Sequence, residues 1–171
     1  MIWGPFRKSS KSKIDAAWWQ AAEAASEQPQ PSAIDALAQS IAPATTTPDE
    51  LERQEEMLTG LRDLAEIAAA SELPVLTTQH RVIGADRCHL IAPVSLGAEA
   101  GGAGKLFLTS ARLVFVGGRV RTWPWHRVRK VTRAGRDLIV IVAGEGEDLL
   151  LQCNTYGEAL VGEYIIKKLT R

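Results

Sequence analysis

Residues 104–117 read Gly-Lys-Leu-Phe-Leu-Thr-Ser-Ala-Arg-Leu-Val-Phe-Val-Gly, and they decide the fold of this 171-residue chain. Two apolar runs, residues 106–108 and 113–116, flank a polar break at residues 109–112. Aromatic and β-branched residues on both arms, with a hydroxyl-rich break between them, are typical of a β-hairpin. We therefore predict two antiparallel strands joined at residues 109–112.

Further strands follow the same logic on both sides of the hairpin. Short apolar runs bounded by turn residues predict a lead-in strand over residues 75–83 and the strands given next. They are residues 88–96, 119–125, 128 onward, 138–142 and 148–153, with a flexible glycine-rich loop at 97–104. The chain then changes period at residue 155. Thr155 and Glu158 form a capping box, and apolar residues at helical spacing predict a final amphipathic helix to residue 169.

The first 72 residues carry a helical pattern instead. A flexible basic lead at residues 1–11 precedes three predicted helices at about 12–27, 33–42 and 48–70, with Ser12, Ser32 and Thr47 as their N-caps. Pro48 after Thr47 is the strongest helix start, because proline suits the first helical position. The residue before Pro74 avoids helical angles, so the helical region spans residues 12–72 and a second unit spans 75–171.

The hairpin resembles the strand pair of GRAM and pleckstrin-homology-like (PH-like) domains, and the resemblance covers about residues 75–170. The residues that carry it are Gly104, Leu106, Leu108, Thr109, Arg112, Leu113 and Phe115, followed by Trp123-Pro124, Val128 and Val131. The resemblance implies an α+β fold. An N-terminal helical region would precede a PH-like antiparallel β-barrel or sandwich, which the C-terminal helix would cap.

Charge is balanced overall at 20 basic and 20 acidic residues, but it is unevenly distributed. Residues 14–72 carry two basic and twelve acidic residues, whereas residues 73–136 carry eleven basic and two acidic ones. The longest aliphatic run, residues 138–143, is too short for a membrane-spanning helix, and the N-terminus has no apolar core of a secretion signal. We therefore expect a cytoplasmic protein, with peripheral association at a membrane as an alternative, and two reduced cysteines.

The candidate binding residues are cations of the basic middle. They are Lys105, Arg119, Arg121, His126, Arg127, Arg129, Lys130 and Arg133. Several cations on neighbouring strand ends can hold a phosphorylated headgroup or an acidic surface through charge-assisted bonds. The alternative is that these side chains are simply solvated or pair with the acidic helix at residues 49–66. The resemblance adds that phosphoinositide-binding members use basic residues of the first two strands, where this chain has only Lys105 beside the acidic Glu99.

We expect a non-enzymatic interaction module. Its predicted role is a protein-binding adaptor that uses the PH-like domain and the acidic helices. The alternative is binding to an anionic membrane lipid or phosphoinositide through residues 119–136. No catalytic motif, metal-ligand spacing or cofactor motif occurs, and His80, His89 and His126 show no ligand pattern. Few stacking aromatics accompany the cations, which argues against nucleic acid. A homodimer through the N-terminal helices is a further possibility.

Overall fold

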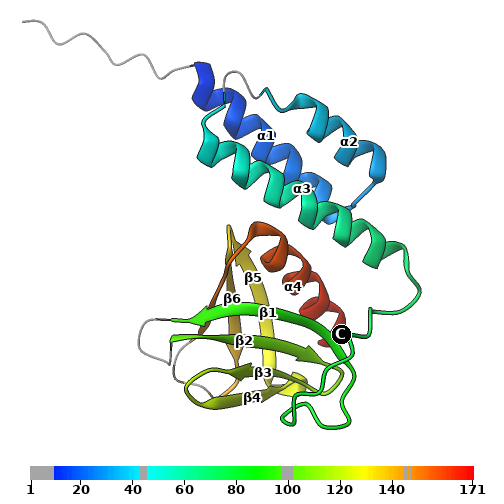
Figure 1. Cartoon of the computed structure of the whole chain (residues 1–171), viewed down its shortest axis with the longest axis vertical. Helices are drawn as coiled ribbons and strands as arrows, with labels where there is room; N and C mark the ends of the chain where they lie inside the picture. The colour runs from blue at the N-terminus through cyan, green and yellow to red at the C-terminus, as the bar shows by residue number, and fades with distance from the viewer. Residues whose placement is uncertain (1–9, 43–45, 98–101, 145, 147) are drawn as a thin grey trace, which may run out of the picture.

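A computed structural model describes residues 10–42, 46–97, 102–144, 146 and 148–171, with side chains from residue 16 onward. The helices are α1 (Ser10–Glu27), α2 (Pro31–Ser40), α3 (Pro48–Ala69) and α4 (Tyr156–Leu169), with a 3-10 turn η1 (Trp125–Arg127). The strands are β1 (Cys88–Leu96), β2 (Gly102–Thr109), β3 (Arg112–Val116), β4 (Val120–Pro124), β5 (Val128–Ala134), β6 (Asp137–Val142) and β7 (Leu149–Cys153). Figure 1 shows α1, α2 and α3 as a layer above α4, with the strands below.

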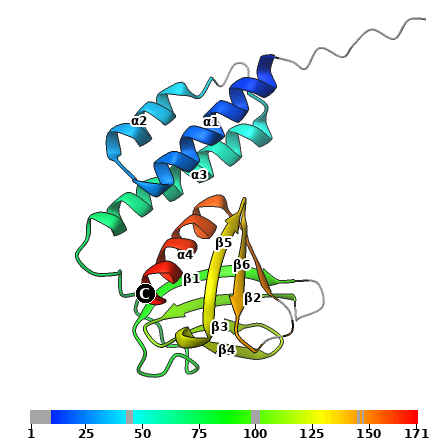
Figure 2. The ribbon, with the colours of Figure 1, turned by 180° about the vertical axis from the view of Figure 1, so that it is seen from behind.

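The seven strands form one antiparallel sheet in the order β4-β3-β2-β1-β7-β6-β5. The sheet bends so that β5 and β6 lie across β1 to β4, and α4 covers one end (Figures 1 and 2). This confirms the predicted α+β class and the PH-like order of strands followed by a helix. Of the two predicted alternatives, barrel and sandwich, the structure shows the sandwich, because the sheet is open: β4 and β5 are the two ends of the order and are joined only through η1.

The predicted hairpin is present as β2 and β3. Its register places Leu108 opposite Leu113 and Leu106 opposite Phe115, and all four side chains are buried. The strand β2 begins at Gly102, so the glycine-rich loop is shorter than expected, and residues 98–101 lie outside the described part. Pro93 is tolerated in β1 because β7 pairs with β1 only from Val94 onward.

Residues 74–87 do not form the predicted lead-in strand. Their only ladder contact among the described residues is an isolated bridge between Leu76 and Cys88. The segment instead runs over the outer side of the first three strands, where Ile83 packs with Phe107 and Val114 in a separate buried cluster. The segment is therefore held on the sheet by the packing of its side chains, and strand pairing contributes only the one bridge.

The helical layer has its own buried cluster. It combines Trp18 and Ala22 of α1, Ile34 and Leu37 of α2, and apolar residues of α3. Thr47 caps α3 as predicted, since its hydroxyl accepts a bond from the Glu50 N–H. The cap prediction for α2 was wrong: the helix begins at Pro31, and Gln30 occupies the N-cap position. The predicted Ser12 cap lies outside the described side chains.

Helix α4 joins the two layers. The Thr155–Glu158 capping box is present as predicted. Leu160 is buried in the cluster of the helical layer, whereas Val161 and Ile165 are buried in the cluster of the sheet. Both faces of α4 are therefore covered, one by the N-terminal helices and one by the strands.

Candidate interaction surfaces

Arg133 of β5 is held inside the protein. It lies two residues after the core residue Val131, and strand alternation points it toward the same side. There its side chain is 5% exposed, and its guanidinium pairs with Glu23 of α1 and lies 3.4 Å from Glu163 of α4. Arg133, predicted as a binding residue, thus makes internal ion pairs in this structure.

Arg136 follows the same pattern. Its Nη2 donates to both carboxylate oxygens of Glu56 in α3, each at 2.9 Å, and the guanidinium lies 5.2 Å from the centre of the Tyr156 ring. The sequence leaves pairing with the acidic helix open for the neighbouring cations, and Arg136, which also belongs to the basic residues 73–136, makes such a pair. Glu56 also accepts the Tyr156 backbone N–H, so one carboxylate connects α3, the β5–β6 turn and the start of α4.

Arg127 also has an internal role. Its Nε and Nη2 donate to the Ala143 carbonyl at 3.0 and 2.8 Å. These bonds connect η1, which precedes β5, to the residue that follows β6. Arg127 therefore links the start of β5 to the end of β6.

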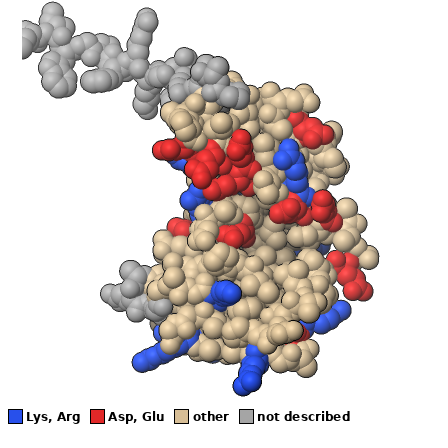
Figure 3. All heavy atoms as spheres, viewed as in Figure 1, with Lys and Arg blue, Asp and Glu red and all other residues tan. Residues whose placement is uncertain are grey.

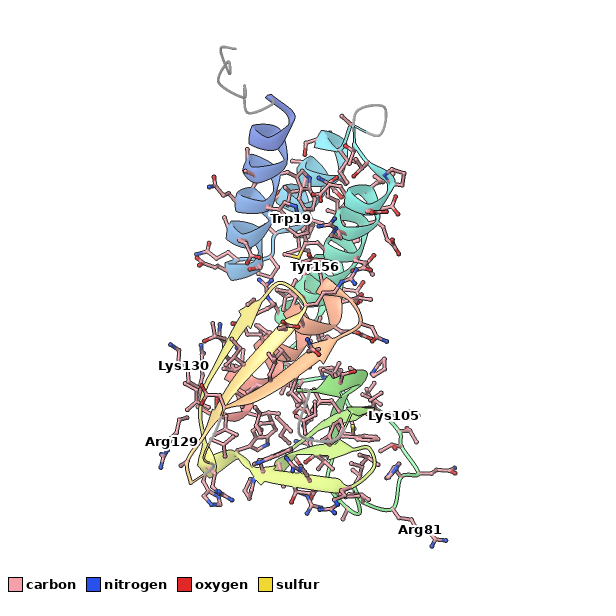
Figure 4. The ribbon with its side chains drawn as sticks, turned by 90° about the vertical axis from the view of Figure 1, so that its left-hand side faces the viewer. Trp19, Arg81, Lys105, Arg129, Lys130 and Tyr156 are labelled. Carbon is pink, nitrogen blue, oxygen red and sulfur yellow. The ribbon has the colours of Figure 1, made fainter. Side chains whose placement is uncertain are left out.

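Arg129 and Lys130 are exposed side by side because of a bulge in β5. The register with β6 shifts between Val128 and Lys130, so two consecutive residues escape the usual in–out alternation. Neither side chain makes an ion pair with a described residue. Figure 4 shows both pointing away from β5 into solvent.

Arg119, Arg121 and Lys105 lie on one sheet but on opposite sides of it. Arg121 is opposite Phe115, whose side chain faces the core, whereas Lys105 is opposite Val116 on the outer side. Arg119 lies two residues before Arg121, directly before β4 begins. All three are exposed. Lys105 therefore does not share a face with the two arginines.

His126 is exposed on η1, and the remaining cations are spread over the molecule. Figure 4 places Lys105 on the opposite side of the view from Arg129 and Lys130. Figure 3 shows acidic side chains gathered over the helical layer and basic ones over the strands. The eight predicted residues thus form no single site: Arg127 and Arg133 are held internally, and the other six are exposed and spread over different sides of the sheet.

Two kinds of residue that matter for the candidate surfaces were not predicted from the sequence. Glu23 and Glu56 hold arginines, yet on their helices they are indistinguishable from other acidic residues. The outward aliphatic residues Ile139 and Ile141 of β6 were read only as part of an apolar strand. Their signal was available, because a strand with aliphatic residues on both sides has an outer surface that needs a cover.

Grooves lie between neighbouring helices in the part of the helical layer that the structure describes. One of about 590 Å³ lies between α1 and α2 and is lined by alanines, with Gln28, Leu37 and Ser40. Another, of about 500 Å³, lies between α2 and α3 beside Ile41 and Leu58. Neither contains a convergent set of titratable groups.

Both cysteines are free and buried. Burial raises the pKa of Cys153 to about 12, and the charges of Glu158 and Asp137 act in the same direction. Burial also raises the pKa of Cys88. The thiols therefore stay protonated and unreactive at neutral pH. Among the described residues, no group of three His, Cys, Asp or Glu side chains could hold a metal ion, and no helix is both long and apolar enough to cross a bilayer.

Searches with the sequence match no family model and no curated protein. Solved structures give weak similarities. The C-terminal domain of an unknown protein from Leishmania infantum is 9% identical, with a TM-score of 0.44, over 53% of this chain and 91% of that one. The DH/PH domain of human ARHGEF11, in a complex with human RhoA, is 12% identical with a TM-score of 0.44 over 96% of this chain. The FERM and C-terminal domain complex of Drosophila Merlin is 8% identical with a TM-score of 0.43, also over 96% of this chain.

This chain spans 56% of the ARHGEF11 chain and 58% of the Merlin chain. Since all three TM-scores lie below 0.5, the PH-like architecture is defined by the strand order and the position of α4 described above.

Proposed function

We propose that this protein is a non-enzymatic PH-like interaction module, of the GRAM type by its hairpin motif, and that its ligand is another protein. The observation that carries the proposal is the dispersal of the exposed cations. A headgroup pocket or an active site needs several polar groups that converge on one concave place. Here Arg127 and Arg133 serve internal contacts, and Lys105, Arg121 and Lys130 lie on different faces. A broad protein surface is compatible with such dispersal.

The helical layer supports the same proposal. It carries exposed acidic residues on α3, including Asp49, Glu52 and Glu55, on a helix fixed to the strands through α4. Protein partners are discriminated largely by complementary charge, and a rigid acidic helix beside a basic sheet offers two opposite patches.

The test is recovery of a partner by the full chain from extracts of its own cells, followed by reconstitution from purified components. We expect a complex of fixed stoichiometry by sedimentation velocity, weakened when Glu52 and Glu55 are changed to lysine or when Arg129 and Lys130 are changed to glutamate. The proposal would be contradicted if no recovered protein formed a complex with the purified chain.

Binding to an anionic membrane is the second candidate. It is favoured by Arg119 and Arg121, which are exposed close together at the start of the edge strand β4. Sedimentation with phosphatidylserine vesicles at low salt tests it. Salt-sensitive binding lost in the Arg119→Glu, Arg121→Glu double variant would establish this function, and absence of binding would remove it.

A homodimer through the N-terminal helices stays a prediction. The alanine-lined groove between α1 and α2 is where a second copy would pack. Light scattering of the full chain decides it, since a monomer at high concentration would rule the dimer out.

A further inference from the structure

The outer side of β6 is apolar, which is unusual for a strand at a protein surface. Leu138, Val140 and Val142 face the core and are at most 5% exposed. Alternation therefore turns Ile139 and Ile141 outward. Ile141 is 38% exposed, which makes it one of the few large aliphatic side chains exposed among the described residues.

Strand pairing places the outward residues of β6 beside those of both neighbouring strands. Ile139 lies opposite Leu150 of β7 and Thr132 of β5, and Ile141 lies opposite Lys130 of β5. Directly opposite residues of an antiparallel pair have Cβ atoms about 5 Å apart, so Ile139 and Leu150 are neighbours on this side of the sheet. We call the surface formed by Arg129, Lys130, Ile139, Ile141 and Leu150 the β5–β7 outer face.

The other half of the sheet shows what normally happens to such a surface. The outward residues Phe107 and Val114 are 2% and 0% exposed, because residues 74–87 lie over them and contribute Ile83. No described segment lies over the β5–β7 outer face. Figure 2 looks onto β5 and β6, and no other element stands in front of them. One apolar outer side is thus covered by the chain itself, and the other is left open.

Charge indicates what occupies the open side. Arg129 and Lys130 lie at one end of it, where the bulge exposes both, and neither pairs with a described carboxylate. Asp137 lies at the other end, opposite Gln152. A ligand for this face needs aliphatic side chains for its middle and carboxylates at the Arg129 end.

We propose that the β5–β7 outer face binds a short segment of another protein in which aliphatic residues stand next to acidic ones. This inference rests on the proposed function and names its site and the chemistry of its partner. Burial of the aliphatic middle would supply affinity, and the two cations would select acidic segments and fix their orientation.

The test is a selection of displayed random peptides on the immobilised full chain, followed by affinity measurements with synthetic copies of the enriched peptides. We expect enrichment of aliphatic residues beside Asp or Glu. Ile141→Asp and Lys130→Glu should each weaken binding by more than about tenfold. Val120→Asp is the matched control, because Val120 is a 50% exposed aliphatic residue on β4, outside the proposed surface. It should leave the affinity unchanged. All positions are on the surface, and circular dichroism checks that each variant folds.

Three outcomes would overturn the inference. Peptides that bind Ile141→Asp as tightly as the original chain would show that the site lies elsewhere, while leaving the proposed function intact. An absence of enriched peptides, together with phosphatidylserine vesicle binding that Ile141→Asp abolishes, would make a membrane the occupant and would contradict the proposed function as well. Self-association that the same substitution abolishes would make a second copy the occupant.

Discussion

Thr109 and Arg112 illustrate, at the scale of the residue, why the hairpin motif reports on fold. The Thr109 hydroxyl accepts bonds from the backbone N–H groups of Ala111 and Arg112, which closes the turn. The Arg112 guanidinium donates to Asp86 at 3.1 Å and to the Val82 carbonyl at 3.2 Å. It thereby fastens the covering segment onto the sheet. Thr109 and Arg112, two of the residues that carry the family resemblance, thus have structural roles within the fold.

The glycines at the two ends of the motif, Gly104 and Gly117, are explained by local packing. A Cβ atom on Gly104 would lie 2.6 Å from the Phe115 ring, and one on Gly117 would lie 2.7 Å from it. At Gly104 a Cβ atom would also lie 2.5 Å from the Val116 carbonyl oxygen, so the two glycines of the motif leave room for the Phe115 ring and for the backbone of the neighbouring strand.

Removing the charge of Arg133 is expected to destabilise the protein. Arg133→Met would leave Glu163, whose side chain is 16% exposed, without its buried partner and would release Glu23. Loss of one member of a largely buried pair costs about 1–3 kcal/mol when part of the cluster reaches solvent. Urea unfolding measures the loss. Arg129→Met is the control, since that side chain is exposed, and equal stability of the two variants would contradict the internal role of Arg133.

Stability should fall at alkaline pH because of Cys153. The folded protein keeps this thiol protonated up to about pH 12, whereas its ordinary pKa is 9.0. Above pH 9 the unfolded chain therefore binds fewer protons than the folded one, and the free energy of unfolding declines as pH rises. The decline attributable to this group is at most about 1.4 kcal/mol per pH unit, and it is absent below pH 9. Urea unfolding at pH 8 and pH 10 should show a shallower decline for Cys153→Ala. An identical decline would show that the thiol is not the cause.

At the scale of the element, the crossing of α3 and α4 depends on two glycines. A Cβ atom on Gly60 would lie 2.3 Å from the Gly157 Cα, and one on Gly157 would lie 3.0 Å from the Gly60 Cα. The two backbones therefore touch, which brings Leu61 and Leu64 of α3 against Leu160 of α4. Close approach is what allows a helix of the N-terminal region to pack on the cap of a sheet.

Gly60→Ala should push the helices apart. Overpacking against rigid backbone costs about 1–3 kcal/mol or more, because no flexible side chain can move aside. Thermal unfolding monitored by circular dichroism measures the change. Gly118→Ala is the control, since a Cβ atom there would meet nothing within 4 Å. Equal melting temperatures for the two variants would contradict the crossing.

Elements with strong local signals could be predicted, and long-range placements could not. The caps at Thr47 and Thr155 and the hairpin were found because their cause lies within a few residues. The segment 74–87 was misread as a strand, because its apolar residues serve a tertiary cover that has no local signature. The candidate cations could not be sorted into paired and exposed residues for the same reason: Arg133 and Lys130 look alike in sequence, and only the bulge in β5 decides which faces solvent.

At the scale of the whole molecule, α4 joins the helical layer and the sheet, because its side chains belong to the buried clusters of both. Each layer contains a buried tryptophan. Trp18 lies among the helices, and its indole N–H donates to the Leu37 carbonyl. Trp125 lies at the sheet, and its indole N–H donates to the Thr109 carbonyl. Trp19 bridges the seam, because its indole donates to Glu50 and its ring lies 5.0 Å from that of Tyr156 (Figure 4). The helical region therefore packs on the PH-like sandwich, and its removal would expose Tyr156, Leu160 and Tyr164.

The central claim is that the helical layer and the sheet form one cooperative unit, which holds the proposed binding surfaces in a fixed arrangement. Urea unfolding of two tryptophan reporters tests it most directly. In a Trp3→Phe background, one reporter keeps only the helical Trp18 and Trp19, and the other keeps only Trp123 and Trp125 of the sheet side. We expect the fluorescence transition of each reporter to coincide with its own far-ultraviolet circular dichroism transition. A fluorescence transition of the helical reporter that precedes loss of the sheet would contradict the claim and would make the two layers independent.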